Sequence, residues 1–346
     1  MDRPVKKLRI LVLVHETLVP PEDISHLTDQ QADEFRTEFD VITTLRELGH
    51  EVRPLGIGDS LRELRLHITR WQPHVCFNLL EEFGGIVTYD QHVVAYLELM
   101  RQPYTGCNPR GLMLSRDKVL SKQLLAYHRI PTPQFAVFRR DRKPIIPRRL
   151  KYPLFVKSAT EDASLGIAQA SVVEDQVRLL ERIQFIHEQT HSDALVEEFI
   201  DGREVYIGVI GNERLTTLAP WELSFGSLSE TALGIATRKV KWDRAYQERH
   251  GIVTGPAKNL PVGVEARLDR MARRIYRALH LSGYARMDLR MRADGSLFFL
   301  EANANPNLEE LEDFGRAAAH AGIEYPQLLQ RILRLGMSYQ AEWRIP

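Results

Sequence analysis

The segment of residues 284–307, YARMDLRMRADGSLFFLEANANPN, narrows the possible folds of this chain more than any other. Two apolar runs flank the pair Asp294-Gly295, and an Asp-Gly pair between such runs favours a β-hairpin. Asp288 lies in the first run and Glu301 in the second, and both have apolar neighbours. We therefore predict two antiparallel strands that each carry one carboxylate.

Two further side chains share a face with these carboxylates, because residues two apart on a strand point the same way. Arg286 precedes Asp288 by two residues, and Asn303 follows Glu301 by two. Mg²⁺ prefers octahedral oxygen coordination by carboxylates together with phosphates and water. We therefore predict that Asp288, Glu301 and Asn303 bind magnesium. Arg286 would stabilise developing negative charge, whereas the alternative, a solvated strand face, is disfavoured by the apolar neighbours.

The first hundred residues alternate between strand and helix patterns. Residues 8–14, LRILVLV, are typical of a strand buried on both faces of a parallel sheet. Residues 39–57 indicate an amphipathic helix that ends near Gly49 and a strand after it, and residues 74–80 indicate a third strand. A chain of 346 residues should form two or three domains. We assign residues 1–105 to an α/β domain with a Rossmann-like parallel sheet.

The rest of the chain reads as an α+β region. We expect a helix from Pro109 to Tyr127 and a solvated connection rich in Pro and Arg over residues 138–153. Strands are expected at 154–158, 167–171, 194–200 and 204–211, and helices at 174–190, 262–280, near Glu312 and near Tyr325. We place a central domain at residues 106–215 and a C-terminal domain, which holds the metal site, at residues 216–346.

The overall composition excludes several classes of function. Lys plus Arg total 46 and Asp plus Glu total 46, so the chain has no net positive charge that would attract nucleic acid or an anionic membrane. Cys76 and Cys107 offer neither a disulfide framework nor metal-ligand spacing. The apolar run near the start is too short for a signal peptide or a membrane span. We therefore expect a cytoplasmic enzyme.

Two loops of the central region suit a nucleotide. Residues 158–167, SATEDASLGI, directly follow Lys157, and a small polar loop of this kind can wrap its amides around phosphate. Residues 197–200, EEFI, lie between two strands and could contact an adenine edge, with Glu204 directed into the cleft. The alternative for the first loop is an ordinary turn next to a surface lysine. The alternative for the second is an edge strand with exposed acidic side chains.

Six segments, in this order, resemble the ATP-grasp superfamily and within it the D-alanine–D-alanine ligases. They span most of the chain and are FNLLEEFGG, YTGCNPRGLMLSRDKVLSK, YPLFVKSATEDASLGI, LVEEFIDGRE, GYARMDL and LEANANP. The resemblance implies an ATP-grasp fold and a ligase that phosphorylates a carboxylate with ATP and then joins it to an amine. Its substrates would be small carboxylates and amines such as amino acids or peptides, and relatives are commonly homodimers.

The resemblance also implies roles for individual positions. The nucleotide-binding positions would be Lys118, Lys157, Ser164, Gly166, Glu197, Glu198, Phe199, Ile200 and Glu204. Asp288, Glu301 and Asn303 would hold two magnesium ions, which manganese could replace. The catalytic positions would be Arg286, which meets the tetrahedral intermediate, Ser164 in the phosphate loop and Lys241 in a lid within residues 223–256.

The sequence departs from the family where the substrates would bind. The Gly-Gly-Thr/Ser signature is absent from HETLVPPEDIS, and nothing in the sequence selects Glu16, Glu34 or Glu38 as a replacement for the glutamate that anchors the first substrate's ammonium in the family. Glu81 stands at the family's histidine position. Asn305-Pro306-Asn307, followed by acids, replaces a glycine motif that receives a carboxylate. These acids favour a cationic or larger acceptor, although Asn305 could equally be the N-cap of an ordinary helix.

From these departures we predict an amide or peptide ligase other than a cell-wall D-alanyl ligase, with Glu81, Asn305 and Asn307 near the substrate. A genuine D-alanine–D-alanine ligase is the first alternative. A non-catalytic ATP-binding protein is disfavoured by the retained metal carboxylates. A different ATP-grasp reaction, such as carboxylation or phosphoryl transfer to another group, is the remaining one.

Overall fold

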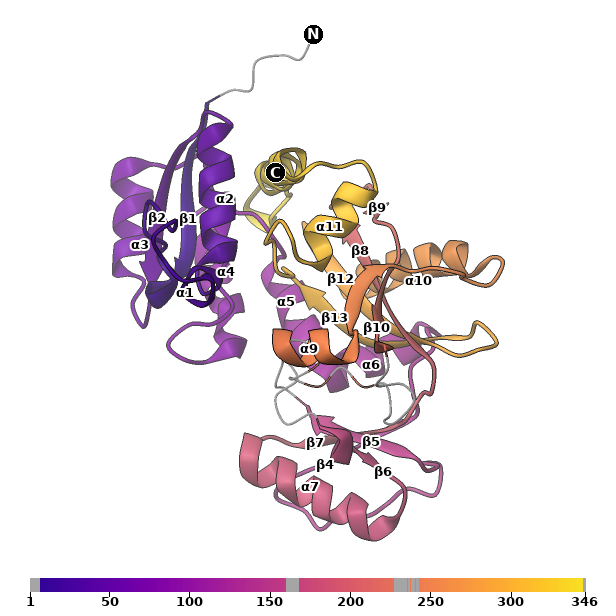
Figure 1. Cartoon of the computed structure of the whole chain (residues 1–346). Helices are drawn as coiled ribbons and strands as arrows, with labels where there is room; N and C mark the ends of the chain where they lie inside the picture. The colour runs from indigo at the N-terminus through magenta and orange to yellow at the C-terminus, as the bar shows by residue number, and fades with distance from the viewer. Residues whose placement is uncertain are drawn as a thin grey trace.

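The computed structural model describes residues 7–159, 168–226, 235, 237, 240 and 243–344, and this part of the chain contains three sheets. Figure 1 shows a parallel sheet with helices on both sides, a large mixed region at the centre and a small sheet with one helix at the far end. Among the helices of these residues, each is too short or too polar for a membrane crossing.

The N-terminal sheet has the order β2-β1-β3 and is parallel, as predicted. Residues 10–14 of β1 have no exposed surface, which fits the unbroken apolar run. The helix α2 ends before Gly49, whose φ of +85° is left-handed and suits a helix C-terminus. The elements are β1 (Arg9–His15), α1 (Asp29–Asp33), α2 (Arg36–Glu47), β2 (Glu51–Ile57), α3 (Arg62–Leu66), β3 (Val75–Asn78) and α4 (Asp90–Leu99).

The single helix predicted over residues 109–127 is wrong, because the segment forms two helices, α5 (Pro109–Arg116) and α6 (Lys118–Tyr127). Asp117 separates them: its backbone is extended, and its side chain accepts hydrogen bonds from the amides of Val119 and Leu120. An aspartate at this position starts a new helix and thereby changes the direction of the chain.

The small sheet is antiparallel, with the order β4-β7-β5-β6, and α7 (Gln176–Thr190) covers it. The strand predicted at 167–171 is wrong: Gln169–Ser171 form a 3-10 turn, and the short strand β6 follows at Val172–Val173. β4 was not predicted, because it is only four residues long and precedes the Arg-rich connection. The strands are β4 (Phe135–Phe138), β5 (Leu154–Ser158), β6 and β7 (Ala194–Glu198).

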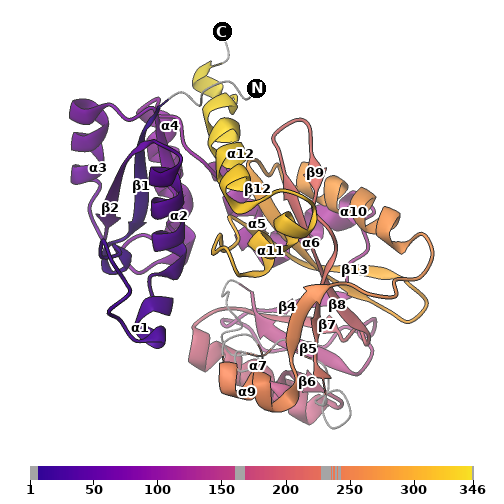
Figure 2. The ribbon, with the colours of Figure 1, turned by 45° about the horizontal axis from the view of Figure 1, so that its top comes forward.

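The large sheet has the order β11-β10-β8-β12-β13, with β9 beside β8. One face packs on α10 through an apolar cluster, and the other packs on α11 and α12 through a second cluster. Figure 2 shows these helices on either side of the sheet. The elements are β8 (Arg203–Ile210), β9 (Thr216–Thr217), β10 (Trp221–Ser224), α9 (Arg244–His250), β11 (Val253–Pro256), α10 (Val264–Ala278), β12 (Tyr284–Met291), β13 (Leu297–Ala304), α11 (Asp313–His320) and α12 (Tyr325–Ser338).

The predicted hairpin is confirmed, because β12 and β13 pair antiparallel across the turn at residues 292–296. The predicted helices at 174–190, 262–280 and after residues 312 and 325 are also present as α7, α10, α11 and α12. β8 lies before the proposed boundary at residue 215 but pairs with β10 and β12, which lie after it. The domain limits at 105/106 and 215/216 therefore stay predictions.

Candidate active site

The hairpin β12–β13 places the predicted metal ligands together. Asp288 and Glu301 are direct cross-strand partners, and so are Arg286 and Asn303. The register shifts between Asp288 and Leu289, which marks a β-bulge next to this row. A bulge of this kind redirects the side chains that follow it and is common beside functional sites.

The two faces of β12 differ in chemistry. Ala285, Met287 and Leu289 have no exposed surface and belong to the apolar cluster on the α10 side. The alternate residues point to the other face, where Asp288 is only 2% exposed and Arg290 is buried as well. Burying charged side chains in this way costs free energy unless each of them has a hydrogen-bond or ion-pair partner.

Arg286 and Asp288 form one such pair. The guanidinium donates from Nε and Nη2 to the two carboxylate oxygens, at 2.8 and 2.9 Å, and lies over the ring of Tyr206. Burial alone would lower the pKa of Arg286, but the charge and hydrogen bonds of Asp288 raise it well above its usual range. The arginine therefore stays charged and is held rigidly beside the predicted metal ligands.

The donor set fits magnesium. Two carboxylates and one amide oxygen leave several octahedral positions, which phosphate and water oxygens would complete. Magnesium would take the Oδ1 atom of Asn303. Its Nδ2 atom is buried and has no hydrogen-bond partner among the described residues, so it could donate to an acceptor such as a phosphate oxygen. In the same part of the chain, no group of three or more His, Cys, Asp or Glu side chains could hold a metal by itself.

A cluster of buried lysines lies opposite the hairpin. Lys157 on β5 and Lys122 on α6 both contact Glu197 on β7, with Nζ–Oε distances of 3.1 and 2.6 Å. The Nζ atom of Lys118 on α6 is 3.9 Å from an Oε atom of Glu301, so this lysine joins the cluster to the predicted metal ligands. The predicted phosphate-binding and metal-binding residues therefore converge, although the former lie on α6 and β5 and the latter on the hairpin of the large sheet.

One carboxylate cannot neutralise two ammonium groups, and the pKa values reflect this. Lys122 has no exposed surface, and burial together with the charge of Lys157 lowers its pKa to about 8. Burial opposes the charge of Lys157 too, but Glu197 and Glu301 raise its pKa. Glu197 stays ionised, because the two lysines outweigh the cost of its burial and lower its pKa. The cluster thus carries surplus positive charge.

Sequence reasoning missed Lys122 and Arg290. Lys122 lies four residues after Lys118 on one helix, so the spacing placed both on the same face. Arg290 continues the alternation from Arg286 and Asp288 along β12. Its Nη2 atom donates to Glu204 at 3.1 Å.

The predicted adenine hinge has an open donor. The amides of Glu198 and Phe199 donate to carbonyls of Gln134 and Pro153, whereas the amide of Ile200 has no partner among the described residues. Glu204 is buried and bonds to the hydroxyl of Tyr206. Three other predicted residues, Ser164, Gly166 and Lys241, lie outside the described part of the chain.

The N-cap interpretation of Asn305 is wrong. Its φ is +53°, and no helix of the described residues begins at Pro306, since α11 starts only at Asp313. The Asn305 Oδ1 atom instead accepts a hydrogen bond from the amide of Cys107 at 2.7 Å. Asn307 accepts one from the hydroxyl of Thr37 on α2 at 2.8 Å. The loop after β13 therefore ties the hairpin β12–β13 to α2 and to the segment around Cys107.

This loop and α2 bring acidic side chains together. Burial raises the pKa of Glu38 to about 7, and the charges of Glu81 and Glu309 add to the effect. Burial also raises the pKa of Glu309 to about 7, with further contributions from acids that include Asp40. The predicted substrate residue Glu81 itself is exposed and lies in the loop after β3.

Replacing Glu38 by glutamine should stabilise the unliganded chain above pH 7. The pKa of Glu38, about 7 in the folded chain, exceeds its ordinary value of 4.5. The contribution of the protonated carboxyl to the free energy of unfolding is therefore fully present below pH 4.5 and is lost as the pH rises through 7. Glu38→Gln should therefore add on the order of 1–3 kcal/mol at about pH 8 and much less at about pH 5. Thermal unfolding at both pH values measures this, with the exposed Glu47→Gln on the same helix as control. Equal shifts at both values would contradict it.

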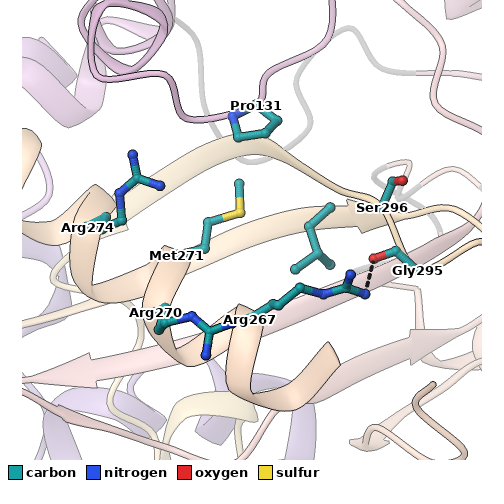
Figure 3. Close-up of a pocket in the computed structure, with 8 residues that line it drawn as sticks. Pro131, Arg267, Arg270, Met271, Arg274, Gly295 and Ser296 are labelled. Carbon is teal, nitrogen blue, oxygen red and sulfur yellow. Dashed lines mark hydrogen bonds between the residues drawn. The ribbon is translucent and has the colours of Figure 1, made fainter. Parts of the chain in front are cut away.

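A hollow of about 320 Å³ lies elsewhere, on the α10 side of the large sheet. Figure 3 shows Arg267, Arg270 and Arg274 of α10 around it, with Arg267 bonded to the carbonyl of Gly295. None of the predicted site residues lines it. We place the candidate site at the hairpin and the lysine cluster, because ionised groups of matched chemistry converge there.

Known proteins resemble this chain in sequence and in fold. The family model described as D-ala D-ala ligase C-terminus matches residues 124–334. Uncharacterized protein y4sG of Sinorhizobium fredii is 34% identical over 305 residues, which cover 85% of each chain. A D-alanine–D-alanine ligase of Nitratidesulfovibrio vulgaris is 33% identical and covers 85% of this chain and 90% of its own. The crystal structure of D-alanine–D-alanine ligase from Bacillus anthracis complexed with ATP superposes with a TM-score of 0.72 at 21% identity, over 95% of this chain and 97% of that one. The predicted fold class, an ATP-grasp fold preceded by a Rossmann-like domain, is confirmed.

Proposed function

The chain belongs to the D-alanine–D-alanine ligase family, and on that basis we propose that it is an ATP-dependent ligase that joins a carboxylate to an amine. The observation that carries the proposal is the convergence of Asp288, Glu301 and Asn303 with three buried lysines. A nucleoside triphosphate binds where acidic side chains hold a divalent cation and basic side chains contact its phosphates.

The nucleotide would lie between the small sheet and the hairpin. Lys118 and Lys157 would contact its phosphates, since their cluster carries positive charge that Glu197 does not neutralise. The open amide of Ile200 would donate to the adenine edge, and the carboxylate of Glu204 would accept from the ribose hydroxyls.

Asp288, Glu301 and Asn303 would hold two magnesium ions, or manganese in their place, against the terminal phosphates. Bound there, the ions would neutralise the charge that develops on the transferred phosphoryl group. The protein itself supplies rigid placement, because Asp288 is fixed by two hydrogen bonds from Arg286.

The proposed reaction has two steps. An oxygen of the substrate carboxylate attacks the γ-phosphorus, the bond to ADP breaks and an acyl-phosphate forms. The amine then attacks the carbonyl carbon, a C–N bond forms, and phosphate leaves with its electron pair while the amine loses a proton. Arg286 would stabilise the negative tetrahedral intermediate, because its guanidinium is partly buried and stays charged.

We propose substrates other than two D-alanines. The loop after β13 presents Glu309 and Glu310, and Glu38 and Glu81 lie on the segments that face it, so a carboxylate there would meet repulsion. A genuine D-alanine–D-alanine ligase is the second candidate, because the Nitratidesulfovibrio vulgaris relative carries that name.

The test is ADP formation with ATP, Mg²⁺ and pairs drawn from a panel of D- and L-amino acids, dipeptides and amines. We expect ADP only when both a carboxylate and an amine are present, with mass spectrometry showing loss of one water from the joined product. D-alanine with D-alanine as much the best pair would favour the second candidate. ATP consumption in the absence of both substrates would contradict the ligase proposal. So would the absence of ATP consumption with every pair of substrates.

A further inference from the structure

The connection between the small and the large sheet lies against one arginine of the large sheet. β7 ends at Glu198 and β8 begins at Arg203, so residues 199–202 lead the chain from one sheet to the other. This connection contains most of the predicted adenine hinge, and the predicted ribose ligand Glu204 follows as the second residue of β8. Arg290 on β12 is the direct cross-strand partner of Glu204. It is therefore placed to act on both parts of the predicted nucleoside site.

Arg290 contacts this segment at three points. Its Nη1 atom donates to the carbonyl of Gly202 and its Nη2 atom donates to Oε2 of Glu204, each at 3.1 Å. The guanidinium carbon also lies 5.6 Å from the centre of the Phe199 ring, which is within cation–π range. Gly202 permits this close fit, because its φ is +143° and a Cβ there would lie only 2.1 Å from the carbonyl oxygen of Met291.

Two donors fix the carboxylate of Glu204 in one orientation. Oε1 accepts from the hydroxyl of Tyr206 at 3.0 Å, and Oε2 accepts from Arg290. The side chains of Glu204 and Arg290 are each only 6% exposed, so the ion pair offsets the cost of burying both charges. Each carboxylate oxygen has two lone pairs, and the same oxygens can therefore also accept from ribose hydroxyls.

Stability alone does not explain a buried arginine at this position. Well-packed apolar side chains are often as stabilising as a buried ion pair, and the alternate positions of β12 already carry such side chains. Two of the three contacts of Arg290, those with Phe199 and Glu204, are instead with residues predicted to bind the nucleotide. The arginine thus joins the hinge and the ribose ligand through a single rigid group.

We propose that Arg290 is a positioning residue for the nucleotide. It orients the carboxylate of Glu204 toward the ribose hydroxyls and holds the hinge at Phe199 against the large sheet, and it acts through these residues rather than by touching the nucleotide. The inference rests on the proposed ATP-dependent function and adds to it a residue that sets recognition of the ribose. Removing the guanidinium should therefore weaken binding by an amount that depends on the ribose hydroxyls.

The test is a calorimetric titration of the full chain, in the presence of Mg²⁺, with ATP and with 2′,3′-dideoxy-ATP, which lacks both hydroxyls. Wild type should bind ATP more tightly than the dideoxy analogue. Arg290→Met should raise the Kd for ATP at least about tenfold and the Kd for the dideoxy analogue less than about threefold, so that the preference is largely lost. Equal factors for the two nucleotides, or a wild type without preference, would overturn the inference.

Two further variants separate positioning from folding. Arg292→Met is the matched control, because Arg292 is exposed two residues further along the same hairpin, and it should bind both nucleotides as wild type does. Arg290→Lys keeps the charge but cannot reproduce the forked contact with Gly202 and Glu204, so its Kd for ATP should lie between those of wild type and Arg290→Met. If circular dichroism shows that Arg290→Met does not fold, Arg290→Lys decides: it must raise the Kd for ATP more than that for the dideoxy analogue.

ADP formation distinguishes failure of this inference from failure of the proposed function. With a productive pair of substrates, Arg290→Met should raise the KM for ATP at least about tenfold and change kcat much less, because Arg290 does not touch the reacting atoms. A loss in kcat with an unchanged KM would contradict the positioning role. If no pair yields ADP but the calorimetric pattern holds, the ligase reaction is refuted and the role of Arg290 stands. Absence of ATP binding to wild type at millimolar concentrations would overturn both.

Discussion

Replacing Asp288 by asparagine should lower the rate of ADP formation at saturating substrates by at least about 100-fold. Asparagine keeps the size and one oxygen of the side chain but removes the charge that faces Glu301 across the hairpin. It also removes the counter-charge of Arg286, whose two hydrogen bonds to Asp288 fix its position. Both the predicted metal site and the group proposed to meet the intermediate are therefore weakened together.

The measurement is kcat over a range of Mg²⁺ concentrations, and the half-saturating concentration should rise in the Asp288→Asn variant. Asp294→Asn is the matched control, because Asp294 is exposed in the turn of the same hairpin and Asn-Gly forms such turns as well as Asp-Gly. Circular dichroism checks that both variants fold. If Asp288→Asn retains more than about a tenth of the wild-type rate at saturating Mg²⁺, Asp288 is not a metal ligand.

The convergence on the hairpin followed from the sequence because it needs only local rules. A strand repeats every two residues, so Arg286 and Asp288 had to share a face, as did Glu301 and Asn303. Direct pairing of Asp288 with Glu301 depends in addition on the bulge at the following residue. A bulge adds one residue without any distinctive residue type, so the sequence could not predict it.

Contacts between distant segments were harder to predict. Asn305 followed by Pro306 has the local signature of a helix start, but its side chain bonds to the backbone of Cys107, 198 residues away. Glu38 was only one of three guessed candidates, because its burial arises where α2 meets the loop after β13. Local propensity is a weak prior that tertiary contacts of this kind override.

Lys122 shows the same limit in the core of the site. The helix pattern put it on the face of Lys118, yet a lysine on a helix is ordinarily a solvated residue. Its complete burial depends on Glu197, which lies on a strand 75 residues later in the sequence. The pair could be recognised only once the small sheet and α6 were brought together.

Replacing Glu197 by glutamine should destabilise the small sheet by about 3–5 kcal/mol, because it leaves Lys122 and Lys157 buried without their shared counter-charge. Lys122→Met should cost much less, since Lys157 and Glu197 would remain as a neutral pair. Hydrogen exchange of the β5 and β7 amides measures the local opening free energy, with the exposed Glu181→Gln on α7 as control.

The penalty in Glu197→Gln should also depend on pH in a defined direction. The pKa of Lys122, about 8 even with Glu197 present, lies below the ordinary 10.5, so the folded state gains stability as pH rises from 8 toward 10.5. Without Glu197 that pKa falls further, and the exchange rates of the variant should approach those of wild type above about pH 9. ATP should also slow amide exchange in the variant, because its phosphates would supply the negative charge that Glu197 no longer provides. If the difference in opening free energy between the variant and wild type changes with neither pH nor ATP, the lysines do not face a phosphate site and the proposed place of the nucleotide is wrong.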